Sequence, residues 1–231
     1  VRAIWIYRGK EIEVGANGGA FSSNTETDQK QLGLAEMKSI ADDAHMYGLK
    51  VAAHAHGASG IRDAIRAGID TIEHASLIDD EGIELAKKHG TWLSMDIYNT
   101  EYTQSEGKKN GVLEDNLRKD REIAETQREG FRKAHKAGVK MVYGTDTGVY
   151  PHGDNGKQFR WMVQYGMTPT QAIQAATFNS SLALARNDVG VIEAGRFADI
   201  VAVKGDPTVD VTLLEQVNFV MKNGKVYKEE K

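Results

Sequence analysis

Residues 51–57 read VAAHAHG, an apolar run that closes in two histidines and a glycine. The same plan recurs: a helix-like segment ends at a glycine, a short apolar run follows, and a side chain able to bind a metal closes it. The four repeats run from Gly48 to His54, Gly68 to His74, Gly90 to Asp96 and Gly138 to Asp146. Glycine just past a helix end adopts the left-handed conformation that stops the helix. Short β-rich runs between helices indicate βα units on a parallel sheet, whose C-terminal strand ends carry the chemistry in parallel barrels.

The composition is that of an ordinary globular protein. The 231 residues are 40% apolar, carry a net charge of −4 and contain no basic block, so we expect neither nucleic acid nor a membrane as a partner. The chain has no cysteine, which excludes disulfides and thiolate ligands. Any metal must therefore be bound by histidines and carboxylates, a donor set that suits Zn²⁺, Mn²⁺, Co²⁺ or Fe²⁺. The compartment stays open, with the cytoplasm slightly favoured.

Periodicity and turn residues predict the order of the elements. We expect strands at 10–15, 49–53, 69–73, 91–95 and 139–143, and helices at 34–47, 58–67, 79–89, 113–137, 155–165 and 169–185. Two polar stretches, at 16–31 and at 97–112, read as long loops. Long loops inside a compact domain are usually functional lids or mobile segments.

The texture of the sequence changes after Asn187. Short β runs alternate there with turns such as Asn223-Gly224, a strong hairpin signal. We therefore divide the chain into residues 1–187, an α/β unit, and residues 188–231, part of a small β unit with too few strands to stand alone. Val1 is not an initiator Met, so we expect a processed or partial chain whose missing segment pairs with this small unit.

Five motifs together resemble the amidohydrolase superfamily, in its branch of Xaa-Pro-dipeptidase-like and imidazolonepropionase-like hydrolases. They are GLKVAAHAHG, AIRAGIDTIEH, YGTDTGVYPHGDN, GMTPTQAIQAAT and GVIEAGRFADIVAV. The resemblance implies a (β/α)8 TIM-type barrel of which strands four to eight are present, with part of a small β-sandwich built from both chain ends. The family's His-x-His pair on strand one has no counterpart here. We therefore expect either a homo-oligomer or association with a missing N-terminal half.

The resemblance also implies a metal site. His54 and His74 would bind a divalent metal, most simply zinc, at the ends of strands five and six. Asp146, at the end of strand eight, would bind the metal, take a proton from the attacking water and pass it to the leaving amine. Glu13 stands where the family has a carboxylated Lys, with Ile12 and its other apolar neighbour pointing to the opposite face.

Several roles stay open at this stage. Glu13 either serves as a metal-site carboxylate or pairs with Lys10 or an Arg and fills space, which leaves one or two metal ions. His56 follows His54 on the same side and is expected to contact the substrate or a ligand. His152 lies on the loop after strand eight and Tyr98 on the long loop, and both are candidates for substrate binding. Asp96 is assigned a structural role.

The expected activity is metal-dependent hydrolysis of amide or peptide bonds in small molecules or dipeptides, by a dipeptidase or carboxypeptidase-like enzyme. A cyclic-amide hydrolase of the imidazolonepropionase type and an esterase are the alternatives within the same site. The rival class is a chain without activity of its own, either a partial chain that needs a complementary N-terminal half or an interaction module.

Overall fold

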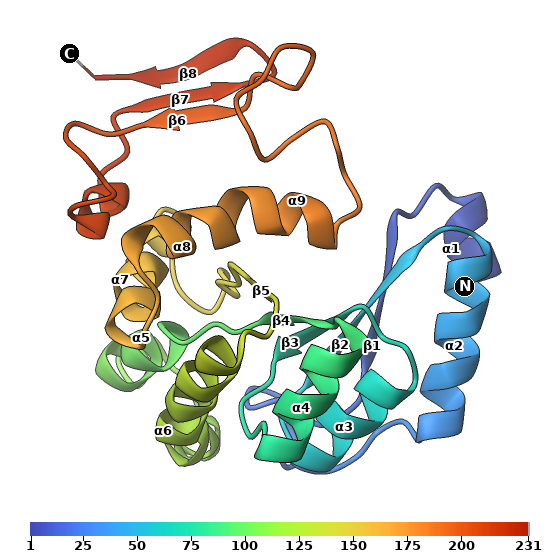
Figure 1. Cartoon of the computed structure of the whole chain (residues 1–231). Helices are drawn as coiled ribbons and strands as arrows, with labels where there is room; N and C mark the ends of the chain where they lie inside the picture. Colours follow the sequence, from blue (N-terminus) through green and yellow to red (C-terminus); the bar gives the residue numbers. More distant parts are fainter. Residues whose placement is uncertain (231) are drawn as a thin grey trace.

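A computed structural model describes residues 1–230, and its centre is a sheet of five parallel strands in sequential order (Figure 1). The strands are β1 (Glu11–Gly15), β2 (Lys50–Ala55), β3 (Thr71–His74), β4 (Trp92–Ser94) and β5 (Met141–Val142). All four pairings are parallel, which confirms the predicted α/β fold with five parallel strands. Within the described residues the sheet is open, because β1 and β5 lie at its two edges.

Helices of different lengths connect the strands. They are α1 (Arg2–Ile6), α2 (Leu34–Met46), α3 (Ala58–Arg66), α4 (Asp80–His89), α5 (Asn99–Glu106), α6 (Glu114–Ala137), α7 (Lys157–Gln164), α8 (Pro169–Gln174) and α9 (Ser180–Ala183). A 3₁₀ turn at Asp154–Gly156 precedes α7, and a π-helical turn at Ala175–Asn179 joins α8 to α9. The predicted single helix at 169–185 is therefore interrupted. Gly138 ends α6 in the left-handed conformation, at φ 79°, as the repeat predicts.

The two faces of the sheet differ in character. Ile12, Ile72 and Leu93 point to one face and join a buried apolar cluster with helix residues such as Ile61 and Phe131. Helices α2, α3 and α4 cover this face (Figure 1). On the other face lie polar side chains of the alternate positions, Glu11, Glu13 and Glu73. Because strand residues alternate between faces, this split follows from the sequence of each strand.

The long polar stretch at 97–112 is not a loop throughout, which corrects the prediction. Residues Asn99–Glu106 form helix α5, which packs against α6. The side chains that α5 buries are Asn99, Thr100 and Thr103. A helix that buries polar side chains shows no apolar period of 3.6 residues, and sequence periodicity therefore misses it.

The C-terminal residues form a second sheet. Strands β6 (Ile200–Ala202), β7 (Phe219–Lys222) and β8 (Lys225–Glu229) pair antiparallel, and a 3₁₀ turn at Val211–Glu215 precedes β7. Figure 1 shows this sheet beyond α9, away from the five-stranded sheet. The antiparallel strands agree with the predicted β texture, whereas the division at residue 187 stays a prediction. No helix within residues 1–230 combines the length and apolar character needed to span a bilayer.

Candidate metal centre and active site

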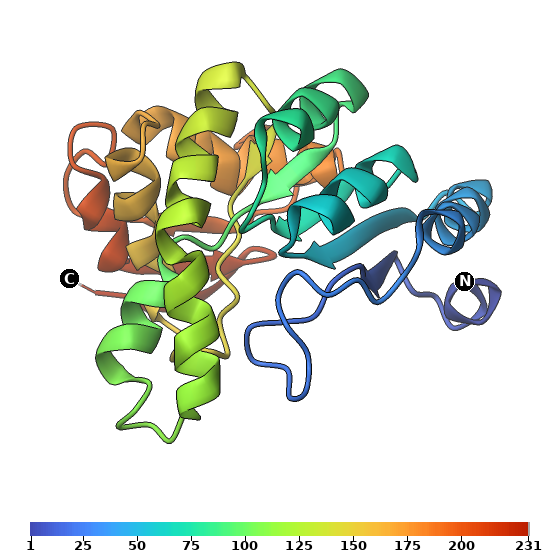
Figure 2. The same ribbon diagram turned by 90° about the horizontal axis from the view of Figure 1, so that it is seen from below.

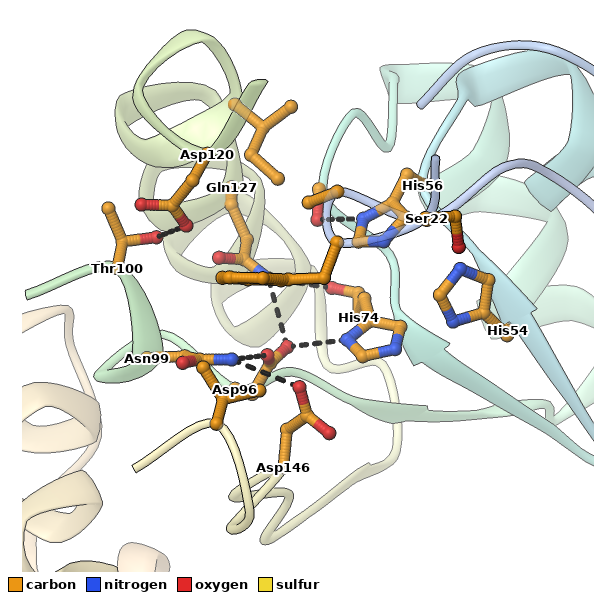
Figure 3. A pocket seen from close by; sticks show the side chains of 16 residues that line it. Ser22, His54, His56, His74, Asp96, Asn99, Thr100, Asp120, Gln127 and Asp146 are labelled. Atoms are coloured by element: carbon orange, nitrogen blue, oxygen red, sulfur yellow. Dashed lines mark hydrogen bonds and ion pairs between the residues drawn. The ribbon is translucent and has the colours of Figure 1, made fainter. Parts of the chain in front are cut away.

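Three histidines meet at the C-terminal edge of the parallel sheet (Figure 3). His54 belongs to β2, His56 follows that strand, and His74 is the last residue of β3. Their ring centroids lie 4.6–4.7 Å apart. One nitrogen of each ring lies within 4.8 Å of a nitrogen of the others. His74 has φ 67° and Ala75 φ 47°, so the backbone turns at the strand end. Within β3 it is Glu73, not His74, that shares the sheet face of His54. The turn after the strand redirects His74 toward the histidine cluster.

Two carboxylates extend the cluster from the other side. Asp96 follows β4 and Asp146 follows β5, and an oxygen of each lies within 4.8 Å of the other and of a His74 nitrogen. The His74 Nδ1 donates to Asp96 Oδ1 at 3.0 Å. Asn99 Nδ2 donates to Asp96 Oδ2 at 3.1 Å and to Asp146 Oδ2 at 3.0 Å. His74 thus belongs to both the histidine group and the carboxylate group.

Burial sets the charge of the imidazoles. Burial, with help from the neighbouring His74, lowers the pKa of His54 to about 4, and burial also lowers the pKa of His56 well below its usual range. Burial opposes protonation of His74 as well, but the charge and hydrogen bond of Asp96 raise the pKa of His74 to about 9. His54 and His56 are therefore neutral near pH 7, the form in which imidazole binds a metal.

The pKa values of the two carboxylates, Asp96 and Asp146, are shifted in opposite directions. Burial alone would raise the pKa of Asp96, but His74 and the hydrogen bond from Asn99 hold that pKa below its usual range. Burial, followed by the charge of Asp96, raises the pKa of Asp146. Two carboxylates with divergent pKa values suit two different roles, a fixed anion and a group that accepts and returns a proton.

A cavity of about 250 Å³ opens onto this cluster. One wall comes from the loop after β1, which supplies Gly19 and Ser22, and another from α6, which supplies Asp120, Ile123 and Gln127. Figure 2 shows the loop (blue) beside the N-terminal part of α6 (yellow-green). The buried ammonium of Lys119 on α6 joins the two walls, because it donates to Ser22 O at 2.8 Å and to Thr25 O at 3.2 Å.

The sequence-predicted residues differ in how they meet this cavity. His54, His56, His74 and Asp146 all line it. His56 is buried and its Nδ1 is hydrogen-bonded to Ser76 Oγ at 2.8 Å, which leaves Nε2 on the cavity side. Glu13 lies on the same sheet face as His54, and the two line an adjoining hollow, but Glu13 belongs to neither ligand group of the described residues.

Two candidates for substrate binding lie outside the cavity lining. His152 is exposed on the loop after β5. Tyr98 is buried and packs edge-on against Tyr150, with ring centroids 5.0 Å apart. Its backbone N–H donates to Gln158 Oε1 at 2.8 Å. Tyr98 therefore supports the start of α5, and its role toward substrate stays a prediction.

Sequence reasoning left several cavity residues without a role. Asp96, which we assigned to structure, contacts His74 directly, and Asn99 and Gln127 both donate to Asp96. The Gly90-to-Asp96 repeat already placed this carboxylate beside the other strand ends. Asp120 and Gln127 lie on the long charged helix, where no sequence pattern separates them from its solvated residues.

The donor set fits a divalent transition metal. Neutral imidazole nitrogens and carboxylate oxygens are the ligands that zinc takes in catalytic sites, usually three from the protein. His54 and His56 supply imidazole nitrogens close to His74 on one side, Asp96 and Asp146 supply carboxylate oxygens close to it on the other, and His74 is common to both groups.

Comparisons with known proteins point to one family. The model of the amidohydrolase family matches residues 6–228. Ochratoxinase from Aspergillus niger is 33% identical over 96% of this chain and 47% of its own length. A Xaa-Pro dipeptidase solved with methionine in its active site is 36% identical, with a TM-score of 0.91 over 99% of this chain and 57% of that one. A prolidase solved with N-methylphosphonate-L-proline is 25% identical, with a TM-score of 0.92 over 99% of this chain and 57% of that one.

The chain thus spans about half the length of the curated relatives it matches. The family model matches nearly all residues of this chain, including every member of the His and Asp cluster. This chain belongs to the amidohydrolase family.

Proposed function

We propose that this chain provides the metal-binding side of the active site of a metal-dependent hydrolase that cleaves amide bonds in dipeptides. The observation that carries the proposal is that the ligand atoms of His74 lie within 4.8 Å of those of His54 and His56 in one group and of those of Asp96 and Asp146 in another. The similarity to a Xaa-Pro dipeptidase and a prolidase supports a dipeptide as substrate, and the similarity to ochratoxinase supports an amide bond as the bond cleaved.

A divalent cation held by these ligands, with zinc the expected ion, would polarise the scissile carbonyl and lower the pKa of water. Asp146 accepts the proton of the attacking water and returns it to the leaving nitrogen. His56, at the cavity wall, offers its Nε2 to the substrate. Glu13 is proposed as an additional carboxylate ligand on the same face as His54, which would allow a second ion.

Metal content and hydrolysis test this proposal together. We expect about one zinc ion or more per chain by mass spectrometry of the purified protein, and loss of activity on chelation. The His54→Ala and His74→Ala variants should each lose metal, whereas His89→Ala, at an exposed helix end, should retain it. A panel of Xaa-Pro and other dipeptides, a cyclic amide and an ester then identifies the substrate class. A protein tested with its complementary half present that binds no metal and hydrolyses none of these substrates would refute the proposal.

A second proposal concerns assembly. The sheet ends at unpaired edges on β1 and β5, and the chain spans about half of its curated relatives. Exposed apolar side chains lie on α1 and at the junction of α9 with the C-terminal sheet, including Trp5, Ile6, Leu182 and Leu184. Unpaired strand edges and exposed apolar patches favour association. We propose that a complementary half closes the sheet into a barrel and completes the site.

A further inference from the structure

A buried carboxylate and a buried amide lie between the proposed ligands, and neither has a role in the chemistry above. Asp96 is 6% exposed and follows β4, and Asn99 opens α5. Asp96 Oδ1 accepts from His74 Nδ1 at 3.0 Å and from Gln127 Nε2 at 3.2 Å, while its Oδ2 accepts from Asn99 at 3.1 Å. Figure 3 shows the Asn99 nitrogen pointing at Asp96 and Asp146 together.

The orientation of the Asn99 amide is fixed by its neighbours. Its Nδ2 donates to one oxygen of Asp96 and one of Asp146, and a rotated amide would instead set Oδ1 against both carboxylates. In this orientation the Asn99 Oδ1 is buried without a hydrogen-bond partner among the described residues. An unsatisfied buried carbonyl is destabilising, so its presence calls for an explanation. Two hydrogen bonds to carboxylates, each stronger than a neutral one, offset that cost.

Asp96 acts on His74 in a comparable way. A hydrogen bond from Nδ1 to a carboxylate fixes the imidazole ring and directs its Nε2 to the opposite side, toward the cluster. Both oxygens of Asp96 are already engaged by three donors, from His74, Gln127 and Asn99. Asp96 is therefore better placed to orient a ligand than to bind the cation itself.

We propose that Asp96 and Asn99 form one positioning unit, in which Asp96 orients His74 and Asn99 holds the Asp146 carboxylate beside it. The proposal rests on the proposed function, because it assigns the roles of ligand to His74 and Asp146. The unit links His74, at the end of β3, to Asp146, which follows β5. These two side chains have no direct hydrogen bond to each other among those found in residues 1–230. Asp96 and Asn99 do not touch the reacting atoms and act through these two residues.

A purely structural role is the competing explanation. The Asn99 backbone N–H also donates to the Asp96 carbonyl at 3.1 Å, and this bond holds the first turn of α5. Substitution of the side chain leaves that bond in place. Asn99→Asp has nearly the same shape but replaces the donor amide by a third carboxylate next to Asp96 and Asp146. The matched control is Asn110→Asp, the same change at an exposed amide whose Nδ2 donates to the Tyr102 hydroxyl at 2.8 Å.

The test compares zinc affinity, the visible spectrum of the Co²⁺-loaded protein, and kcat and KM for the best dipeptide. Substitution of a residue that orients a ligand typically costs about 10–100-fold in metal affinity or activity. We expect that loss in Asn99→Asp, with an altered Co²⁺ spectrum and an effect on kcat rather than KM, and wild-type values in Asn110→Asp. Asp96→Asn, which keeps shape and removes one charge, should weaken zinc binding in the same range.

The outcomes separate the two proposals. A wild-type protein that binds zinc and cleaves dipeptides, with Asn99→Asp and Asp96→Asn unchanged in affinity and Co²⁺ spectrum, would overturn the positioning unit alone. A wild-type protein that neither binds metal nor shows activity with its complementary half present would overturn both. If circular dichroism shows that Asn99→Asp is unfolded, Asp96→Asn decides by the same measurements, since an amide at position 96 still accepts from the His74 ring.

Discussion

Substitution of Gly60 by alanine should destabilise the protein, although alanine is the better helix former. Gly60 lies in the first turn of α3, four residues after His56. A Cβ at this position would overlap the Asn17 Oδ1 and lie 2.6 Å from its Cγ. Asn17 is 1% exposed, accepts from Gly57 N at 3.2 Å and donates to Asp28 O at 3.2 Å. The added methyl group therefore displaces the side chain that ties the loop after β1 to the site.

The magnitude follows from the two hydrogen bonds and from helix propensity. Each hydrogen bond of Asn17 contributes about 1 kcal/mol to stability, and overpacking adds about 1–3 kcal/mol of cost. Replacement of a helical glycine by alanine returns up to about 1 kcal/mol. We expect a net loss of about 2–5 kcal/mol in the free energy of unfolding, measured by urea denaturation. Weaker zinc binding should accompany it, because the same loop carries Gly19 beside His54.

A double-mutant cycle identifies the cause. In an Asn17→Ala background the space beside Gly60 is open, so Gly60→Ala should become neutral or stabilising by up to about 1 kcal/mol. The sign of the effect should thus reverse between the two backgrounds. Equal destabilisation in both backgrounds, or a stabilised single variant with unchanged zinc affinity, would refute the reasoning.

Three further predictions follow from other contacts. Lys119→Met keeps the volume of a 1% exposed side chain but removes its donors to Ser22 and Thr25, so amide hydrogen exchange in 18–30 should accelerate, whereas exchange in β2 should not. Burial favours a raised Asp70 pKa, but the hydrogen bonds from Lys50, His45 and the Val51 backbone N–H together outweigh it and lower that pKa, so the carboxylate stabilises the fold above pH 4. Asp70→Asn should therefore have a lower free energy of unfolding than the wild type in urea at pH 7. The difference between the two proteins should become smaller below pH 4. Light scattering should show this chain alone as an associated species, and a monodisperse, cooperatively melting monomer would contradict the assembly proposal.

The repeated sequence pattern of a glycine, an apolar run and a metal-ligand side chain predicted most of the parallel sheet. A glycine that ends a helix and an apolar run that starts a strand are both local signals, so all five parallel strands could be placed from sequence. Because parallel strands end at one edge, His54, His74, Asp96 and Asp146 could also be expected there. The alternation in β1 was predicted as well, since Ile12 is buried among the helices and Glu13 lies on the other face.

What sequence could not show depends on contacts between distant elements. Helix α5 is hidden because its buried residues are polar and bond to α6, as in the hydrogen bond from Thr100 Oγ1 to Asp120 Oδ1 at 3.0 Å. The amide of Asn99 reaches Asp146, 47 residues away, only because α5 begins where β4 has just ended. Gln127 reaches Asp96 from the middle of a 24-residue helix. No local pattern records which side of that helix faces the site.

The polar face of the sheet adds a requirement to the assembly proposal. Glu11, Glu13 and Glu73 share this face around Ala52, and burial raises the pKa of Glu73 to about 7. The opposite face is already filled by helices, so closure of the sheet would enclose the three carboxylates. Enclosed carboxylates need donors or cations, because burial without them is costly. A complementary half that offered only strand edges and apolar side chains would leave these acids unpaired. We therefore expect that half to present amide, hydroxyl or cationic side chains, or ligands for a second ion, opposite Glu13.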